Sequence, residues 1–362
     1  MLKKIILKLH LYLGLVASLI LIIVAISGAL LSYEKELLRI FNSDSFYVKP
    51  QEKLLPLGEI IEKFQVQKLR AKITSISLAG ELDSSYTIRV ASKTNRKGDS
   101  LYINPYTAEI LPEVNGAEFF KFIEDLHRRL TFGEIGKQIV GASTIILIVL
   151  LLSGIYMYMP KMKRGFINSL KVNKKAKRIG FLSSLHSAIG IWIIPLYLTV
   201  SLTGLYWSYT WYRGALFTLT GVEKPQRSFK KGEQKRLSIE PKEVENVFEK
   251  FHHEIKEYQY LMMFMPHNTK EYRFSYVDKN PSHVYARNSL TIDASSMNIT
   301  QHERYDDKTV GGKFMASMLA LHSGEYFGFV GQFLMFLASL AMPLFGITGL
   351  MLYLKKKEKK VR

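Results

Sequence analysis

Four long stretches of the chain are apolar and free of Asp, Glu, Lys and Arg: Leu9–Tyr33, Gln138–Pro160, Ile179–Tyr212 and Tyr326–Leu354. An α-helix rises about 1.5 Å per residue and needs about 20 apolar residues to cross the hydrocarbon core of a bilayer. Each stretch is long enough, so the pattern predicts four membrane-spanning helices. The first is longer than the apolar core of a cleavable signal peptide and lacks a small-residue cleavage site, which favours a retained signal anchor.

The pattern changes in the two long segments between these spans. Leu54–Lys68 has apolar residues at helical spacing, and Pro241–Glu254 reads as a helix with Pro near its start. Short alternating runs bounded by turn residues follow each helix and predict antiparallel strands. These runs are Ile73–Leu78, Tyr86–Val90 and Leu101–Pro105 in the first segment, and Tyr258–Met265, Tyr272–Val277 and His283–Asp293 in the second. Each segment therefore predicts a small α+β module.

The two halves of the chain repeat one plan. Leu9–Tyr33 and Leu185–Tyr209 both begin with Leu-His, carry Gly four residues after the His, and end in Ser-Tyr; Ser27-Gly28 in the first matches Thr203-Gly204 in the second. Each long segment ends in a short helical piece with Leu-His and then a glycine-marked break. Residues 1–160 and 181–355 thus read as two copies of one unit. Since each copy has two spans, the copies are predicted to insert in the same orientation, related by a pseudo-two-fold axis along the membrane normal.

The net charge of +19 is concentrated at alternate ends of the spans. Seventeen basic residues and a single acid, Glu358, lie in the segment before the first span, in residues 161–178 and in residues 355–362. Basic residues at alternate span ends mark the cytoplasmic side. Both termini and the short middle loop are therefore predicted to be cytoplasmic, and the charge indicates topology and contact with membrane lipid rather than nucleic acid. Cysteine is absent, which excludes disulfides, thiolate metal sites and cysteine nucleophiles.

The predicted fold is a four-helix transmembrane bundle built from two parallel repeats, with two α+β modules outside the membrane. In chain order it comprises transmembrane helix 1 (1–33), module 1 (34–117), a His-bearing interfacial helix with transmembrane helix 2 (118–160), a basic cytoplasmic loop (161–180), transmembrane helix 3 (181–212), module 2 (213–312), a second His-bearing interfacial helix with transmembrane helix 4 (313–354), and a basic cytoplasmic tail (355–362).

Four of the nine histidines follow a leucine and recur at equivalent places in the two copies: His10, His127, His186 and His322. His10 and His186 lie where spans one and three leave the cytoplasm, and His127 and His322 lie just outside spans two and four. A pseudo-two-fold axis brings equivalent residues face to face, so each pair can bind one metal from opposite sides. Pairing within one repeat remains an alternative at this stage.

Two neutral imidazoles on opposite faces of a planar macrocycle are the ligands of a six-coordinate b-type haem. The pairs therefore predict two haem b groups per chain. A zinc or copper site is an alternative, but each pair offers two ligands with no third residue fixed nearby. A further alternative is that these histidines lie at the membrane interface and only form hydrogen bonds with carbonyl groups or lipid headgroups. Arg128 and Arg129, directly after His127, can pair with haem propionates or act as interfacial anchors.

Several catalytic sequence motifs are absent. The chain has no GxGxxG after a strand, no GK[ST] phosphate loop, no HExxH and no GxSxG. It therefore has no flavin or nicotinamide domain of its own, no catalytic residue is assigned beyond the cofactor ligands, and any electrons must come from another molecule.

Four blocks in order resemble the PepSY-associated transmembrane family, often called iron-regulated or iron-uptake membrane proteins. They are LHLYLGLV…SGALLSY at Leu9–Tyr33, DLHRRLTFGEIGKQIVG at Asp125–Gly141, LHSAIGIW…LTGLYWSY at Leu185–Tyr209 and LHSGEYFGFVGQ at Leu321–Gln332. The resemblance implies a multi-pass protein of the bacterial inner membrane with two periplasmic PepSY-like modules. Some members are reductases that bind two b haems and move electrons to ferric siderophores, and others carry a fused flavin domain that this chain lacks.

The expected function is therefore an oxidoreductase for iron acquisition. A cytosolic flavoprotein or the membrane quinol pool donates an electron to the cytoplasmic-side haem of His10 and His186. The electron passes to the haem of His127 and His322, and from there to a ferric siderophore or other ferric chelate. The first alternative is a non-redox membrane-anchored PepSY scaffold or regulator that binds a peptide, a peptidase or a transporter. The second is translocation without reduction, which the lack of a carboxylate inside the spans disfavours.

Overall fold

The computed structural model describes residues 1–93, 95, 98–224, 239–267 and 269–361, with the backbone alone at 356–361. The chain divides into two compact units. One, here called the helical unit, comprises Met1–Glu34, Glu118–Val222 and Ser317–Arg362. The other, the sheet unit, comprises Lys35–Ala117 and Glu223–Ala316. Each unit therefore takes segments from both halves of the chain.

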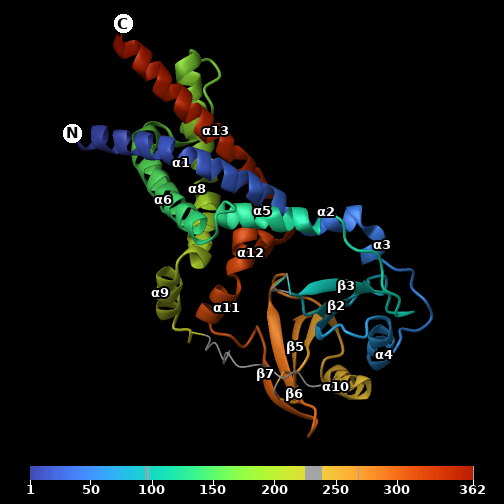
Figure 1. The fold of residues 1–362 in the computed structure, drawn as a ribbon. Coiled ribbons are helices and arrows are strands. Elements are labelled where there is room, and N and C mark those ends of the chain that lie inside the picture. Colours follow the sequence, from blue (N-terminus) through green and yellow to red (C-terminus); the bar gives the residue numbers. More distant parts are fainter. Residues whose placement is uncertain (94, 96–97, 225–238, 268, 362) are drawn as a thin grey trace. The chain divides into compact units, whose positions relative to one another are not determined.

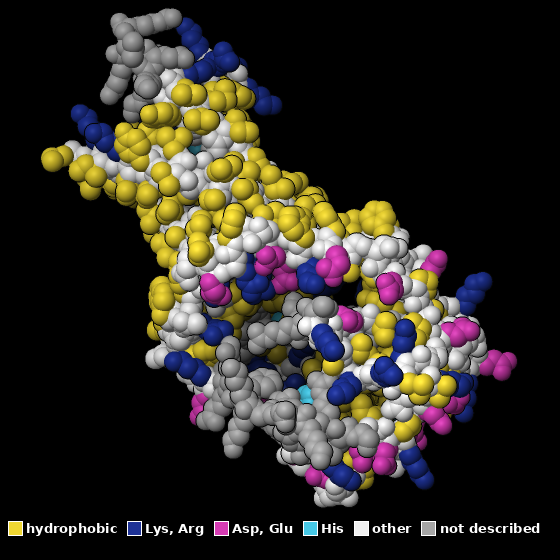
Figure 2. Space-filling view, in the orientation of Figure 1, with side chains coloured by type: hydrophobic (Ala, Val, Ile, Leu, Met, Phe, Trp, Pro, Cys, Tyr) yellow, Lys and Arg dark blue, Asp and Glu magenta, His cyan; other side chains and the backbone are white. Residues whose placement is uncertain are grey.

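Four helices of the helical unit are long and apolar enough to cross a membrane, as predicted. They are α1 (Leu2–Ser32), α6 (Gly133–Arg164), α8 (Arg178–Ser208) and α13 (Gly328–Val361) (Figure 1). Large apolar side chains on their outer surfaces are exposed, for example Val16 and Leu152. Figure 2 shows this hydrophobic surface, with Lys and Arg gathered near the chain ends. Such a surface is stable in lipid and not in water.

The four long helices form a bundle in which α1 packs against α6 and α13, and α8 packs against the same two helices. Consequently α1 and α8 are diagonal partners. The interior between them is filled by Ala17, Leu21, Leu147, Leu151, Tyr197, Ala338 and Met342. Tyr197 donates its hydroxyl proton to the carbonyl oxygen of Ala338 at 2.9 Å. In lipid, close packing and such interhelical hydrogen bonds hold helices together, because lipid tails solvate apolar side chains as well as other side chains do.

Short helices precede or follow the long helices in the sequence. They are α5 (Ala117–Arg129), α7 (Phe166–Ser169), α9 (Thr210–Thr220), α12 (Met318–Ser323) and the 3-10 turn η1 (Glu325–Phe327). A glycine-marked break separates α5 from α6 and α12 from α13. At the second break Gly324 has φ of +84°, and a Cβ there would collide with the backbone of Gly331. Only glycine adopts this conformation without strain.

The sheet unit contains helices α2 (Glu34–Phe41), α3 (Ser43–Phe46), α4 (Leu57–Gln67), α10 (Pro241–Glu254) and α11 (Val310–Ala316). Its strands are β1 (Ile73–Ala79), β2 (Tyr86–Val90), β3 (Asp99–Ile103), β4 (Tyr258–Phe264), β5 (Glu271–Asp278), β6 (Arg287–Asp293) and β7 (Asn298–Glu303). They form one antiparallel sheet in the order β3-β2-β1-β4-β5-β6-β7. The α+β character agrees with the prediction.

The two modules differ from the prediction in sharing a single sheet. Strand β1 pairs with β4, with Ile76 opposite Met263, so the first module continues directly into the second. Helices α4 and α10 cover one face of this sheet, and Phe251 stacks on Phe274 with ring centroids 4.5 Å apart. The pairing gives β1 and β4 a hydrogen-bonded neighbour on both sides and leaves β3 and β7 as the edges of the sheet.

Candidate functional site: two histidine pairs

His10 and His186 face each other from the diagonal helices α1 and α8. We call them the span pair. Their ring centroids are 6.3 Å apart and their ring planes are inclined at 73°. Both rings are half-buried. The structure therefore brings together the two histidines that the repeat made equivalent.

Each ring of the span pair bonds a hydroxyl on the following long helix. His10 Nδ1 lies 2.8 Å from Ser153 Oγ, and His186 Nδ1 lies 2.8 Å from Thr348 Oγ1. Ser153 donates its hydroxyl proton to the carbonyl oxygen of Leu150, and Thr348 donates to that of Leu344. A hydroxyl has one proton, so each of these oxygens can only accept a hydrogen bond from the histidine.

His127 in α5 and His322 in α12 form the second pair, here called the junction pair. Their ring centroids are 6.2 Å apart and their planes are inclined at 69°. His127 Nδ1 lies 2.8 Å from the carbonyl oxygen of Val24 and 3.3 Å from Ser27 Oγ. His322 Nδ1 lies 2.9 Å from Thr203 Oγ1. The junction pair thus has the same kind of partners on α1 and α8.

The hydroxyl groups that contact the junction pair also donate their protons to their own helices. Ser27 donates to the carbonyl oxygen of Ile23 at 2.7 Å, and Thr203 donates to that of Thr199 at 2.6 Å. Burial lowers the pKa of His127 and, together with the charge of His127, lowers the pKa of His322 to about 4. Both imidazoles are therefore neutral near pH 7.

These hydrogen bonds assign one tautomer to all four rings: Nδ1 carries the proton and donates it, and Nε2 keeps its lone pair. In the part of the chain that the structure describes, no protein group hydrogen-bonds any of the four Nε2 atoms. A histidine whose Nδ1–H is oriented by a hydroxyl or carbonyl oxygen and whose Nε2 is free has the form of a metal ligand.

Each hydroxyl is followed by a glycine, in Ser27-Gly28, Ser153-Gly154, Thr203-Gly204 and Thr348-Gly349. A Cβ at Gly28 would lie 2.9 Å from Cε1 of His127, and one at Gly204 would lie 3.3 Å from Cε1 of His322. In the junction pair the hydroxyl therefore orients the ring and the glycine makes room for it, whereas a Cβ at Gly349 would touch nothing within 4 Å. Sequence reasoning noticed the dipeptide in spans one and three as a mark of duplication. It missed the copies in spans two and four, and it did not foresee that all four hydroxyls contact the histidines.

The spacing within both pairs matches that of two imidazoles on one metal. Two imidazoles that bind one metal from opposite sides, with metal–nitrogen bonds of about 2.0 Å, have ring centroids roughly 6 Å apart. Among the described residues no group of three or more His, Asp or Glu gathers to hold a bare metal ion. Each pair thus offers two imidazole nitrogens, a donor set that suits a group bringing its own remaining ligands, as a haem does.

The two pairs lie far apart along the bundle. Ser27, which bonds His127, lies seventeen positions after His10 on α1, and Thr203, which bonds His322, lies seventeen positions after His186 on α8. At the rise of an α-helix this is about 25 Å. The bundle therefore carries one pair toward each end.

Arg128 and Arg129 lie on α5 beside His127 in the sequence. Arg128 pairs with Glu124 at 2.6 Å and Arg129 with Asp125 at 3.0 Å, both one helical turn earlier. All four side chains are more than a third exposed, and exposed ion pairs of this kind contribute only about 0.3–0.5 kcal/mol. These guanidinium groups can therefore exchange partners at little cost, and their pairing with propionates stays a prediction.

An aromatic ring packs against one histidine of each pair. Phe345 contacts His186 with centroids 5.3 Å apart, and Trp207 contacts His322 at 5.4 Å. The equivalent residues of the first repeat are Leu150 and Leu31. A Cβ at Gly14 would touch Leu150 just as one at Gly190 would touch Phe345, at 3.7 and 3.6 Å. The two repeats therefore have the same histidines but different residue types beside them.

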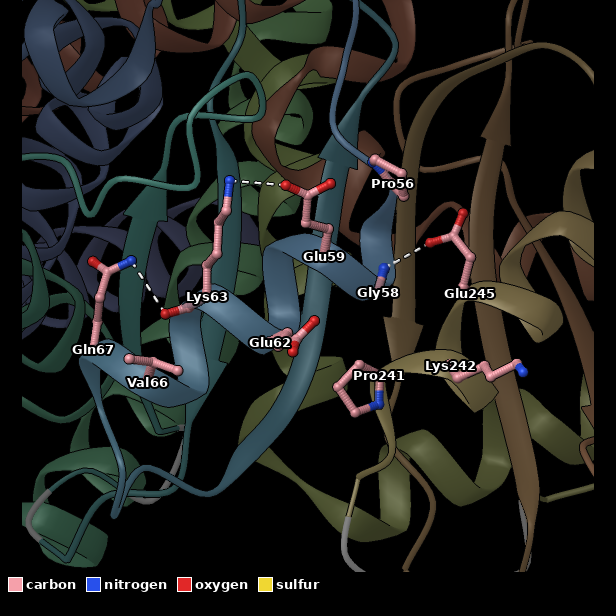
Figure 3. A pocket seen from close by; sticks show the side chains of 10 residues that line it. All are labelled: Pro56, Gly58, Glu59, Glu62, Lys63, Val66, Gln67, Pro241, Lys242 and Glu245. Atoms are coloured by element: carbon pink, nitrogen blue, oxygen red, sulfur yellow. Dashed lines mark hydrogen bonds and ion pairs between the residues drawn. The ribbon is translucent and has the colours of Figure 1, made fainter.

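A groove along α4 and α10 in the sheet unit is the other candidate site (Figure 3). Its charged groups are largely used by the fold. Lys63 pairs with Glu59 at 2.8 Å, and Glu245 accepts a hydrogen bond of 2.6 Å from the backbone N–H of Gly58 at the start of α4. A carboxylate at a helix N-terminus stabilises that helix. This groove is explained by the packing of the two helices.

Comparison with known proteins assigns the chain to a family. The profile of the PepSY-associated TM region matches residues 7–356, nearly the whole chain. No curated protein matches it. The match reaches from the first long helix to the last and includes the sequence segments of the sheet unit. The chain therefore belongs to the family of PepSY-associated transmembrane proteins, and it is a multi-pass membrane protein.

Proposed function

We propose that the protein is a di-haem oxidoreductase that carries electrons across the bacterial inner membrane to a ferric siderophore or another ferric chelate. The observation that supports this most strongly is the shared state of the four histidines. Each has its Nδ1 proton bound by a hydroxyl or carbonyl oxygen, and each faces a partner ring at 6.3 or 6.2 Å.

Haem b with two imidazole ligands supplies a one-electron Fe(III)/Fe(II) couple. His10 and His186 would hold one group, and His127 and His322 the other. Ser153, Thr348, Ser27 and Thr203 fix the azimuth of these rings and increase the basicity of Nε2 by accepting from Nδ1. Arg128 and Arg129 are the nearest candidates in sequence for propionate partners of the junction site.

The direction of transfer follows from the positive-inside pattern. The basic segments at 1–8, 161–178 and 355–362 put both termini in the cytoplasm and the sheet unit in the periplasm. Electrons then enter at the span pair from a cytosolic flavoprotein or from quinol and leave at the junction pair. Reduction releases iron because the hard oxygen donors of a siderophore hold Fe(III) far more tightly than Fe(II).

The function is tested with the full chain in proteoliposomes that enclose a reductant. A ferric chelate and a colorimetric Fe(II) trap are added outside, and the rate of Fe(II) formation is measured. We expect formation that depends on the protein and falls to background in His322→Ala. His253→Ala, which removes an exposed histidine of α10, is the matched control and should be unchanged. Equal rates in His322→Ala and the unsubstituted protein would overturn the proposal.

A further inference from the structure

The sheet has a face opposite α4 and α10, here called the open face. Side chains alternate between the two faces of a strand. Ile76, Leu261 and Phe274 point into the core under the helices, so their neighbours in sequence point to the open face. The strand register then places these residues there: Ser75, Ser77, Thr87, Arg89, Tyr102, Tyr260, Met262, Phe264, Arg273, Ser275, Arg287, Ser289 and Thr291. Its central row, made of Thr87, Ser77, Met262, Ser275 and Ser289, is a floor of mainly hydroxyl groups, with arginines and aromatic rings around it.

Three arginines of the open face, Arg89, Arg273 and Arg287, lie around this central row. Arg89 shares a cross-strand row with Ser75, Phe264 and Arg273, so three strand spacings, about 14 Å, separate the two arginines at their bases. Arg287 lies on β6, four residues along from Thr291, which is opposite Arg273. This is again about 14 Å from Arg273. Arg273 is therefore the central arginine, and the spacing lets a compact ligand contact it together with either Arg89 or Arg287.

Aromatic rings support two of these guanidinium groups. Arg273 lies over the ring of Phe264 at 4.4 Å, and Arg287 lies over the ring of Tyr260 at 5.7 Å. Tyr260 in turn donates its hydroxyl proton to Ser77 Oγ at 3.0 Å. Stacking leaves the N–H groups of a guanidinium available and keeps its plane oriented.

A fourth arginine borders the face. Arg39 is on α2, and Phe46 of the neighbouring α3 contacts Tyr102 with ring centroids 4.8 Å apart. Burial raises the pKa of Tyr102, while the positive charges of Arg39 and Arg89 act in the opposite direction, so both cations lie near this hydroxyl. Lys35, also on α2, donates to the hydroxyl of Tyr285 at 2.7 Å.

The positive charge of the open face is not neutralised by the fold. In the part of the chain that the structure describes, Arg39, Arg89, Arg273 and Arg287 make no ion pair. The acids that the register assigns to this face stand at its margin: Glu271 and Asp293 at strand ends, and Glu303 on the edge strand β7. Glu303 is already bound by Lys308 and by Gln301, and Asp293 accepts from the backbone of Ser295 and Ser296.

We propose that the open face binds the substrate as a polyanionic metal chelate whose oxygen donors are catecholates or carboxylates. Guanidinium groups match such oxygens with paired N–H donors, and they attract aromatic catecholate rings as well. The hydroxyl floor adds neutral hydrogen-bond donors. A neutral or cationic hydroxamate chelate lacks the net negative charge that four unpaired arginines attract. That the metal is iron rests on the proposed function, whereas the charge and donor class of the ligand rest on this face.

The test uses the full chain in detergent and gallium(III) chelates, which resemble the ferric complexes and cannot be reduced at accessible potentials. Binding is measured by calorimetry for gallium(III) tris-catecholate, gallium(III) citrate and the gallium complex of a linear tris-hydroxamate that bears a free ammonium group. We expect the two anionic chelates to bind and the hydroxamate to bind at least tenfold more weakly, and the stronger of the two anions identifies the donor type.

Substitutions locate the site. Arg273→Gln, Arg287→Gln and Arg89→Gln should each weaken binding of the anionic chelate about tenfold, the loss expected for a charge-assisted hydrogen bond. Arg70→Gln is the matched control, since Arg70 is an exposed arginine before β1 and outside the open face. Circular dichroism verifies that each variant is folded.

Three results would overturn the inference: no binding of either anionic chelate, equal binding of the hydroxamate, or a loss in Arg70→Gln equal to the losses on the open face. Because gallium is not reduced, these results are independent of electron transfer. A protein that binds gallium(III) tris-catecholate and carries no haem would retain this site and refute the proposed function.

Discussion

The span pair and the junction pair present the same chemistry from different parts of the fold. In the span pair a long helix carries the histidine and the next long helix carries the hydroxyl, as in His10 with Ser153. In the junction pair a short helix carries the histidine and a long helix the hydroxyl, as in His322 with Thr203. The common element is a hydroxyl that has already donated its proton to its own helix. The comparison teaches that the acceptor for Nδ1–H, and not the type of helix, defines these sites.

The largest effect should come from removing a ligand, because a bis-histidine site cannot keep six-coordination with one imidazole. His127→Ala and His322→Ala should each abolish the same haem signal, and His10→Ala and His186→Ala the other one. Haem content and reduced spectra of the four purified variants decide this. If His10→Ala and His127→Ala removed the same signal instead, the histidines would pair within one repeat and the comparison would be wrong.

Loss of a hydroxyl partner should be the next largest effect. Ser153→Ala and Thr348→Val remove the acceptor for His10 and His186, and loss of such a partner typically weakens a metal site by about 10- to 100-fold. Haem retention and the midpoint potential of the span site are the measurements. Thr144→Val is the control, because the Thr144 hydroxyl bonds only the carbonyl oxygen of Val140 on its own helix. If Thr144→Val lost as much haem as Ser153→Ala, the hydroxyls that contact the histidines would have no special role.

Glycine substitutions should lower haem affinity at the junction site more than at the span site. Gly28→Ala places a methyl group 2.9 Å from the His127 ring, and overpacking of this kind costs about 1–3 kcal/mol, or roughly tenfold in affinity at the junction site. Gly204→Ala, with 3.3 Å to His322, should have a smaller effect. Gly349→Ala should have none, since nothing lies within 4 Å of its added carbon. Titration of apoprotein with haem gives the three affinities, and an equal loss in all three would contradict the geometry.

The smallest effect should come from the aromatic neighbours. Phe345→Leu and Trp207→Leu install the residues of the first repeat beside His186 and His322, at a cost of about 0.5–1.5 kcal/mol for each lost ring contact. Freed rings can rotate, so the low-spin electron paramagnetic resonance signal of one site should broaden or shift in each variant, the span site in Phe345→Leu and the junction site in Trp207→Leu. Identical spectra in both variants and the unsubstituted protein would show that these rings do not orient the ligands.

Much of this architecture could be predicted because long uncharged stretches and a duplicated Leu-His leave few alternatives. The β1–β4 pairing could not, since alternation identifies the faces of a strand and not its neighbour. Strand β7 was missed because Asn298–Glu303 is largely exposed and has no buried alternating face. The four hydroxyls were missed because a serine or threonine in a helix ordinarily bonds its own backbone, and only the structure places a histidine on its other side.

The most direct test of the central claim is the optical spectrum of the full-length protein purified from cells supplied with haem, recorded oxidised and then dithionite-reduced, with haem quantified as the pyridine haemochrome. We expect two b haems per chain with the sharp reduced α-bands of low-spin, six-coordinate iron. Folded protein with no Soret band would contradict it, and the non-redox membrane scaffold would then be the better description of this chain.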